Sequence, residues 1–284
     1  MYIGRFAPSP TGPLHIGSLL AAVISYLDAK ANNGQWLLRI DDIDPPREQA
    51  GASDAIIKTL EQHGLHWDGN VFYQSDRFDA YQAAIEALLR DDLIYPCQCS
   101  RKQLNATQGI HPEQCIQPLD TNAPFAYRIK KGRYQFNDLY QGSQSGSDGH
   151  FVIKRRDQLF AYQLAATVDD HAQNISHVIR GYDLLDSTPK QLLLYQALNY
   201  QPPKFGHFPV ITAANGQKLS KQNLAPAINN DQALTNLQLV MRYLNMTPPD
   251  TSSIEALLQW ATLAWKTAAP KNLNQPEIGI ITSE

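Results

Sequence analysis

The residues whose types and spacing best suit chemistry begin with a short segment near the start of the chain. Positions 8–18 read Pro-Ser-Pro-Thr-Gly-Pro-Leu-His-Ile-Gly-Ser. A helix beginning near Ile16 would turn its unpaired amides and positive dipole end toward this segment, which suits a phosphate. Gly17 lets a ligand approach the backbone closely, and His15 can donate a hydrogen bond to a phosphate or ribose oxygen, with Ser18 beside it. A Pro-rich turn with an ordinary helix cap is the alternative.

The second such segment lies two hundred residues later and reads Lys-Leu-Ser-Lys-Gln at 218–222. Lys218 and Lys221 could neutralise a phosphate while it is attacked, or they could belong to a solvated basic loop. Together the two segments predict a site that holds a nucleoside triphosphate during attack on its α-phosphate.

A third group contains every cysteine of the chain. Cys97, Cys99, His111 and Cys115 lie within a short stretch and supply four soft or borderline ligands. This set fits a tetrahedral zinc site of the Cys₃His type, and a closed four-ligand site is structural. Buried reduced thiols with an unrelated histidine are the alternative.

Composition limits the class of protein. Apolar residues make up 43% and charged residues 18% of 284 residues, the net charge is −3 and the pI is about 6.2. These values are ordinary for a globular protein and argue against a bulk electrostatic coat for nucleic acid. The sequence shows neither a bilayer-spanning apolar run nor a signal peptide, so we expect a cytoplasmic protein without membrane contact. An odd number of cysteines argues against a disulfide framework.

The elements expected to position these residues form a βαβ pattern. A strand at 2–6, a helix at 16–32 and a strand at 35–40 open it, with Gly34 as a plausible end of the helix. The residue pattern changes at 94–160, where Gly/Ser clusters, the cysteines and short strand-like pieces occur. We interpret this stretch as an insertion, after which the βαβ pattern returns. The other expected elements are helices at 50–63, 76–91 and 189–198, short strands including 126–129 and 174–180, a βα loop at 169–171 without an assigned role, amphipathic helices to about 267 and a C-terminal tail.

The two phosphate-type segments, in this order, resemble the signature pair of class I aminoacyl-tRNA synthetases, and the wording around them resembles the glutamyl group. The matching motifs are Arg-Phe-Ala-Pro-Ser-Pro-Thr-Gly at 5–12, Arg-Ile-Asp-Asp-Ile-Asp at 39–44, Val-Ile-Arg-Gly-Tyr-Asp-Leu-Leu at 178–185 and Ser-Thr-Pro-Lys-Gln at 187–191. The resemblance implies a Rossmann-type parallel sheet of the α/β class, with an inserted zinc-bearing subdomain and a C-terminal helical region like a stem-contact fold. It divides the chain into 1–93 and 161–205 for the two catalytic halves, 94–160 for the insertion and 206–284 for the last region.

Few residues follow Gln222, too few for the helical anticodon-reading domains of glutamyl-tRNA synthetases. The chain therefore resembles the shortened glutamyl-queuosine tRNA(Asp) synthetase family. That resemblance implies ligase activity with ATP, Mg²⁺ and L-glutamate, and transfer of glutamate to queuosine in the anticodon of tRNA(Asp), by a protein expected to be a monomer. A minimal conventional glutamyl-tRNA synthetase and a non-catalytic RNA- or protein-binding paralogue remain the alternatives.

The resemblance also implies site residues. It assigns glutamate binding to Arg5, Ser9, Asp41, Tyr162 and Arg180, with Asp41 one methylene shorter than the glutamate found in many relatives. It assigns ATP binding to His15, Gly17, Ser18 and Lys221, and catalysis to His15, Lys218 and Lys221. One structural zinc is implied at Cys97, Cys99, His111 and Cys115, where His111 takes the place of a tyrosine.

Overall fold

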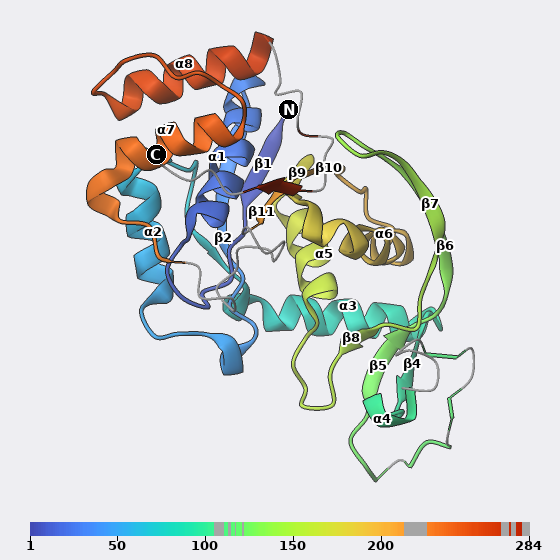
Figure 1. The fold of residues 1–284 in the computed structure, drawn as a ribbon. Helices are drawn as coiled ribbons and strands as arrows, with labels where there is room; N and C mark the ends of the chain where they lie inside the picture. The colour runs from blue at the N-terminus through green and yellow to red at the C-terminus, as the bar shows by residue number, and fades with distance from the viewer. Residues whose placement is uncertain are drawn as a thin grey trace.

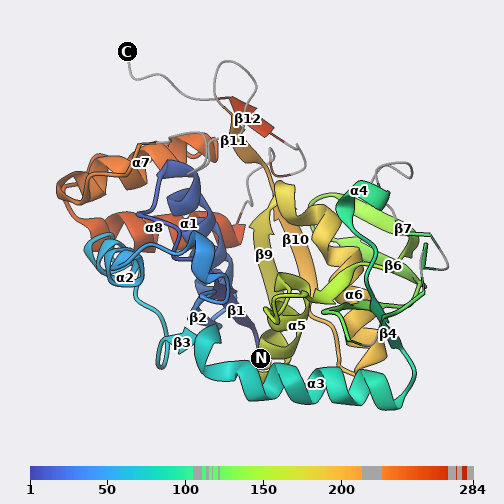
Figure 2. The same ribbon diagram turned by 90° about the horizontal axis from the view of Figure 1, so that it is seen from below.

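Parallel strands form the centre of the fold. The computed structural model describes residues 1–104, 111–112, 115–116, 118–120, 122–212, 226–267, 273 and 277–279. Two parallel sheets lie side by side, the first ordered β1-β2-β3 and the second pairing β9 with β10 (Figures 1 and 2). Their strands are β1 (Ile3–Phe6), β2 (Gln35–Ile40), β3 (Phe72–Tyr73), β9 (His177–Gly181) and β10 (Lys204–Phe208). The Ser176 amide donates to the Ile3 carbonyl at 2.9 Å and joins β1 to the start of β9. The expected α/β class with a parallel sheet is confirmed.

Helix α1 (Ile16–Ala31) begins directly after the turn that follows β1, and it packs against both β1 and β9. Most of its apolar positions, among them Leu20, Ile24 and Leu27, are buried in the main core. The helix ends through Asn33, which takes the left-handed conformation at φ 52°. Gly34 therefore is not the left-handed residue, and it is needed because a Cβ there would lie 2.6 Å from the Tyr2 carbonyl oxygen.

Helices cover both sides of the parallel strands (Figure 2). On the α1 side lie α2 (Ala52–Gln62), α7 (Ala233–Tyr243) and α8 (Ile254–Thr267). On the other side lie α3 (Phe78–Arg90), α5 (Tyr162–Ala172) and α6 (Thr188–Ala197). Helices α2, α3 and α6 lie where the periodicity predicts them, and α7 and α8 are the expected amphipathic helices, whereas α5 covers 169–171, for which the sequence predicts a loop.

Antiparallel strands occupy the stretch between the two parallel sheets in the sequence. The order β4-β5-β8 forms one sheet, β6 and β7 form a long hairpin, and a short helix follows β4. Their bounds are β4 (Ile94–Cys97), α4 (Arg101–Leu104), β5 (Ala126–Ile129), β6 (Gly132–Asp138), β7 (Gly142–Asp148) and β8 (Val152–Lys154). The Gly/Ser-rich run at 142–147 is a regular strand, because its backbone pairs with β6 throughout. The domain boundaries at 93, 160 and 205 stay predictions.

The C-terminal segment departs from the expected tail. Strand β12 (Glu277–Gly279) pairs in parallel with β11 (Val210–Thr212), and Leu273 is buried in the main core. Short 3₁₀ helices complete the described chain: η1 (Pro45–Arg47), η2 (Gln74–Arg77), η4 (Tyr182–Ser187) and η6 (Asn230–Gln232).

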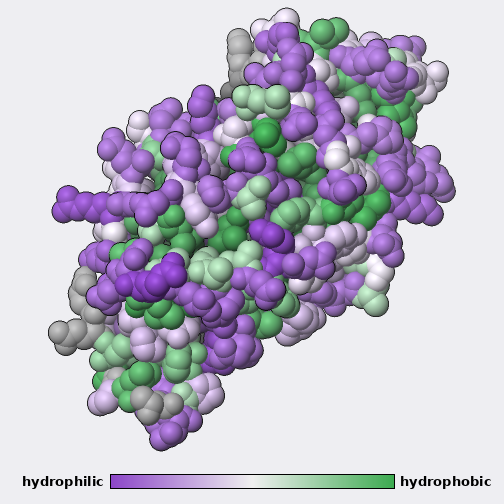
Figure 3. Space-filling view, turned by 180° about the vertical axis from the view of Figure 1, so that it is seen from behind, coloured by the Kyte–Doolittle hydropathy of each residue, from purple (hydrophilic) through white to green (hydrophobic). Residues whose placement is uncertain are grey.

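The mixture of hydrophilic and apolar side chains on the surface agrees with the ordinary composition of the chain. The space-filling view from behind shows hydrophilic side chains over much of the face, with apolar ones between them (Figure 3). Among the residues that the structure describes, each helix is too short or too polar to cross a bilayer.

Candidate active site

A pocket of about 280 Å³ opens where β1 and β9 end and α1 begins. Ligands of open α/β sheets bind at the carboxyl ends of the strands, and α1 adds its amino end there. Seven of the predicted site residues line this pocket: Arg5, Ser9, His15, Gly17, Ser18, Tyr162 and Arg180.

His15 is the N-cap residue of α1. Its Nδ1 accepts a hydrogen bond from the Ser18 amide at 3.3 Å, so in the neutral ring the proton lies on Nε2. The ring is therefore a donor at Nε2, at the amino end of a helix. This arrangement suits an anion such as a phosphate.

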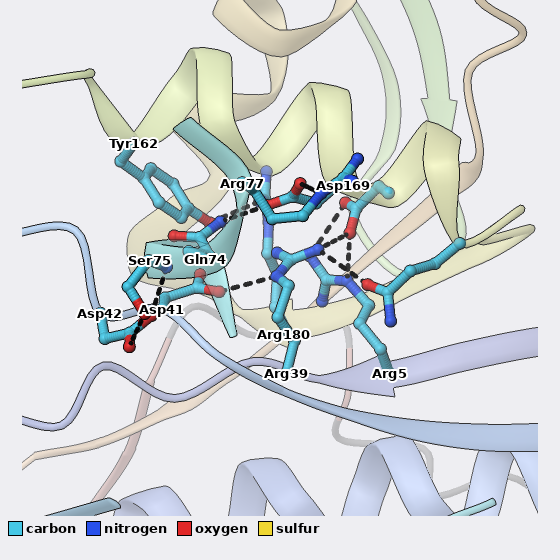
Figure 4. A network of polar contacts seen from close by, with 12 residues as sticks. Arg5, Arg39, Asp41, Asp42, Gln74, Ser75, Arg77, Tyr162, Asp169 and Arg180 are labelled. Carbon is cyan, nitrogen blue, oxygen red and sulfur yellow. Dashed lines mark hydrogen bonds and ion pairs between the residues drawn. The ribbon is translucent and has the colours of Figure 1, made fainter. Parts of the chain in front are cut away.

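Arg5 lies at the floor of the pocket and is already paired. Its Nε and Nη2 donate to the two oxygens of Asp170 at 3.1 and 3.3 Å. Arg39 donates from Nη1 to the same carboxylate at 2.5 Å and from Nε to Asp41 at 2.7 Å. Figure 4 shows the arginines gathered beneath α5. One buried carboxylate thus holds two buried guanidinium groups, and losing one partner of such a group typically costs about 3–5 kcal/mol.

Asp170 had been expected in a loop without a role, and that expectation is wrong. Asp169 and Asp170 lie inside α5 and are buried. Burial by itself raises the pKa of Asp170, but Arg5 and Arg39 outweigh it and lower the pKa below its usual range. Asp169 instead accepts from the Tyr81 hydroxyl at 2.6 Å and the Gln74 amide at 2.9 Å. The signal in the sequence was two adjacent acidic residues within an apolar helical stretch, because buried charges need partners.

Asp41 lies in a neighbouring pocket of about 450 Å³, which shares Ser9 and Tyr162 with the first. The carboxyl group is buried, and burial raises its pKa to about 6 although Arg39 pulls the other way. Asp44 and Arg155 also line this second pocket. An ionised Asp41 can pair with an ammonium group, and its elevated pKa makes that pairing dependent on pH.

Arg180 differs from Arg5 in its partners. It donates to the Tyr162 hydroxyl at 3.1 Å, to Nε2 of His207 at 3.0 Å and to the Thr188 hydroxyl at 2.7 Å, and all three acceptors are uncharged. Burial lowers its pKa, yet an arginine stays charged at neutral pH. The pocket therefore contains a buried cation whose hydrogen-bond partners leave its charge unneutralised, which favours binding of an anion. His207 is not among the site residues predicted from the sequence.

The predicted metal ligands form a compact cluster. One ligand atom each from Cys97, Cys99, His111 and Cys115 lies within 4.8 Å of all the others. Nδ1 of His111 donates to the Pro112 carbonyl at 2.6 Å, which leaves Nε2 toward the sulfurs, 3.2 Å from Cys97 Sγ. The donor set and spacing fit a tetrahedral zinc ion.

The surroundings of Cys97 favour a thiolate. The Cys99 amide donates to its sulfur at 3.3 Å, and Arg128 Nε donates at 3.2 Å. Burial opposes the charged form, but these donors outweigh it and lower the pKa of Cys97. Metal ligation requires the thiolate form, so these contacts also fit a zinc site.

Lys218 and Lys221 lie outside the described residues, but the chain on either side of them is placed. Val210 and Ile211, just before that segment, line the pocket. Ala227, just after it, forms a backbone bridge with His15. Both flanks of the lysine segment therefore lie at the pocket.

Comparison with known proteins supplies the family. The profile of the family described as tRNA synthetases class I (E and Q), catalytic domain, matches residues 3–246. The chain belongs to this family. It is thus a ligase of the aminoacyl-tRNA synthetase type.

Curated relatives match nearly the full length of the chain. The protein of Pseudomonas fluorescens named Glutamyl-Q tRNA(Asp) synthetase is 46% identical over 286 residues, which cover 97% of this chain and 96% of that one. The protein of the same name from Serratia proteamaculans is 43% identical over 274 residues, covering 93% and 90%.

Solved structures agree in fold. A glutamate tRNA ligase from Elizabethkingia meningosepticum, in complex with its amino acid, is 30% identical with a TM-score of 0.68 over 78% of this chain and 52% of that one. The glutamate-tRNA synthetase of Elizabethkingia anophelis, at 24% identity, has a TM-score of 0.80 over 99% and 68%.

Proposed function

We propose that the protein activates L-glutamate with ATP as glutamyl adenylate and transfers the glutamyl group to queuosine in the anticodon of tRNA(Asp). The observation that carries the first step is the shared pocket, where a buried cation and the amino end of α1 face the same space. The acceptor rests on the name shared by the relatives of similar length.

For activation, glutamate brings two carboxylates and an ammonium group. Arg180 and Arg5 would receive one carboxylate at the floor of the pocket, and Asp41, when ionised, would receive the ammonium group. The other carboxylate then attacks the α-phosphorus of ATP, a phosphorus–oxygen bond forms, and pyrophosphate leaves. His15 and the α1 amides would hold the nucleotide, which enters with its Mg²⁺, and catalysis is chiefly positioning and charge stabilisation.

The lysine segment would complete the nucleotide site. Ala227, which follows the lysine segment, is bridged to His15, and Ile211, which precedes it, lines the pocket. These two flanks support the proposal that Lys221, with Lys218, stabilises charge on the leaving pyrophosphate.

For transfer, a hydroxyl of the cyclopentenediol of queuosine attacks the adenylate carbonyl. An ester bond forms, AMP leaves, and the hydroxyl loses its proton. The second pocket, which adjoins the first through Ser9 and Tyr162, offers space for the acceptor nucleoside. Bases of an anticodon loop can be splayed out and read by stacking and edge contacts.

The Cys₃His cluster is proposed to hold one zinc ion, with Cys97, Cys99, His111 and Cys115 as ligands. Bound there, the ion would cross-link β4 to the segment around Cys115 and act structurally, because a set of four protein ligands fills a tetrahedral site. Nδ1 of His111, fixed by the Pro112 carbonyl, keeps the coordinating nitrogen oriented.

The decisive experiment compares two acceptors. The protein is incubated with ATP, labelled glutamate and tRNA(Asp) carrying either queuosine or unmodified guanosine, and the tRNA is then digested and analysed by mass. We expect glutamyl-queuosine from the first tRNA and unlabelled anticodon nucleosides from the second.

The partial match to a glutamate tRNA ligase favours one alternative, a conventional glutamyl-tRNA synthetase. Glutamate on the 3′-terminal adenosine would support that alternative and contradict the proposal. A protein that supports neither transfer nor glutamate-dependent ATP–pyrophosphate exchange would be a non-catalytic paralogue.

A further inference from the structure

A chain of three buried polar side chains runs from the hairpin to the pocket. Asp138 at the end of β6 is 1% exposed, His207 on β10 is fully buried, and Arg180 on β9 is 5% exposed. Arg180 and His207 are direct partners in the parallel register of β9 and β10. The strand pairing therefore fixes where the two side chains meet.

Asp138 fixes the orientation and tautomer of His207. Its Oδ2 accepts from Nδ1 of the imidazole at 2.5 Å, and its Oδ1 accepts from the backbone amide of His207 at 3.1 Å. The amides of Tyr140 and Gln141 donate to the same oxygen, each at 3.0 Å. With four donors, the group is a carboxylate, and the imidazole proton lies on Nδ1.

The other nitrogen of the imidazole is consequently an acceptor. Nε2 of His207 receives the hydrogen bond from Arg180 Nε at 3.0 Å, and the Thr188 hydroxyl lies 3.0 Å from the same nitrogen. Thr188 in turn accepts from Arg180 Nη2 at 2.7 Å. One edge of the guanidinium is thus held by neutral groups, and its Nη1 points toward Tyr162.

This arrangement separates orientation from charge neutralisation. A carboxylate placed directly on Arg180, as Asp170 is on Arg5, would fix the guanidinium but would also compete with an anionic ligand. The neutral imidazole between Asp138 and Arg180 gives the same fixed geometry while the positive charge stays available. Burial lowers the pKa of His207, which agrees with a neutral ring.

We propose that His207, held by Asp138, is a positioning residue that sets Arg180 to receive a carboxylate of the amino-acid substrate. The inference rests on the proposed function, since it takes glutamate as the ligand. It predicts that the pair governs glutamate affinity rather than nucleotide binding or turnover.

The test uses the full-length protein and two substitutions that remove different contacts in the series Asp138–His207–Arg180. His207→Leu deletes the acceptor, and Asp138→Asn removes the negative charge that selects the tautomer. We expect the glutamate KM in ATP–pyrophosphate exchange to rise about 10- to 100-fold in His207→Leu. This is the range typical when a residue that orients a metal ligand is removed, and His207 orients Arg180 in a comparable way. The kcat and the KM for ATP should stay near wild-type values, and calorimetric glutamate affinity without ATP should fall in parallel.

Two further variants separate positioning from general stability. His207→Gln keeps an acceptor near the Nε2 position and should recover most of the glutamate affinity. His63→Leu is the matched control, because His63 is fully buried and bonds to the Thr59 carbonyl at 2.7 Å but lies outside the pocket. It should lower the unfolding midpoint in urea while leaving the glutamate KM unchanged.

Unchanged glutamate binding in folded Asp138→Asn and His207→Leu would overturn the inference. So would equal losses of glutamate and ATP affinity that follow the loss of stability. If His207→Leu fails to fold, the inference is tested on Asp138→Asn and His207→Gln. For these variants the change in the glutamate KM is compared with the change in the KM for ATP. Absence of glutamate binding and exchange in the wild-type protein would instead refute the proposed function, and the inference with it.

Discussion

At the scale of single residues, the pocket combines two ways of keeping a buried arginine. Arg5 shares the single carboxylate of Asp170 with Arg39, so its charge is only partly balanced inside the protein. Arg180 is held by uncharged acceptors, so its positive charge is not neutralised by these partners and can pair with an anionic ligand. Asp41 completes the set as a carboxyl group whose pKa is raised to about 6 by burial. This distribution of charge suits a ligand that carries both carboxylate and ammonium groups.

The pKa of Asp41 leads to a pH prediction. Below about pH 6 the group is protonated and neutral, and above it the carboxylate can pair with the substrate ammonium. We therefore expect kcat/KM for glutamate in pyrophosphate exchange to rise as the pH increases through about 6 and then to level off. Asp41→Asn should remove this acid limb and cost about 1.5–3 kcal/mol at neutral pH, as for other hydrogen bonds to charged groups.

The pH experiment needs its own controls. The KM for ATP, measured over the same pH range, should not change near pH 6. The pH profile of kcat/KM for glutamate in Asp41→Glu should still rise with pH on its acid side. A glutamate profile of Asp41→Asn that overlays the wild-type profile would show that another group titrates.

At the scale of elements, the site depends on where strands end and where α1 begins. The turn after β1 delivers Ser9 and His15 to the amino end of α1, and β9 delivers Arg180 from the adjacent sheet. Strand β11 and the Ala227 bridge hold both flanks of the lysine segment at the same pocket. Each functional group therefore comes from an element boundary, where side chains and backbone amides are accessible.

The position of both flanks of the lysine segment at the pocket supports a direct role of Lys221. Lys221→Ala should lower kcat/KM for pyrophosphate exchange by the equivalent of about 2–4 kcal/mol, as expected for loss of a charge donor aimed at the transition state. Lys58→Ala, an exposed change on α2, is the matched control and should leave exchange unchanged. Exchange near the wild-type rate in Lys221→Ala would remove Lys221 from the mechanism.

The metal cluster belongs to the antiparallel part of the fold, and its loss should be local. We expect about one zinc per chain in protein purified without added metal. Chelation should speed amide hydrogen exchange in β4 and β5 more than it slows glutamate activation. The reason is that β4 carries Cys97 and β5 pairs with β4. A zinc content near zero with all three thiols freely titratable would contradict the assignment.

At the scale of the whole molecule, the pocket lies between two parallel sheets that the chain builds from distant segments. Residues from β1, α1, α5 and β9 meet there, while β4 and α4 project away from it (Figure 1). The described part of the pocket is assembled within this one chain, with the arginines already oriented. Such preorganisation reduces the cost of binding.

This preorganisation predicts activation without RNA. Glutamate-dependent ATP–pyrophosphate exchange should occur in the absence of any tRNA, and aspartate or glutamine in place of glutamate should support it weakly. An exchange signal that appears only after tRNA is added would show that the acceptor is needed to complete the site.

The amino-acid sequence by itself determined the opening strand–helix–strand order, most of the helices, the motifs of the pocket and the set of cysteines, because these depend on local periodicity and on residue types at short spacing. The tertiary structure decided which charges meet. Asp170 faces Arg5 and Arg39, and His207 joins Asp138 to Arg180, only because distant strands and α5 pack together. Likewise β7 is a strand through backbone pairing with β6 that its Gly/Ser-rich sequence does not encode. Long-range contacts of this kind leave no periodic signal in a single sequence.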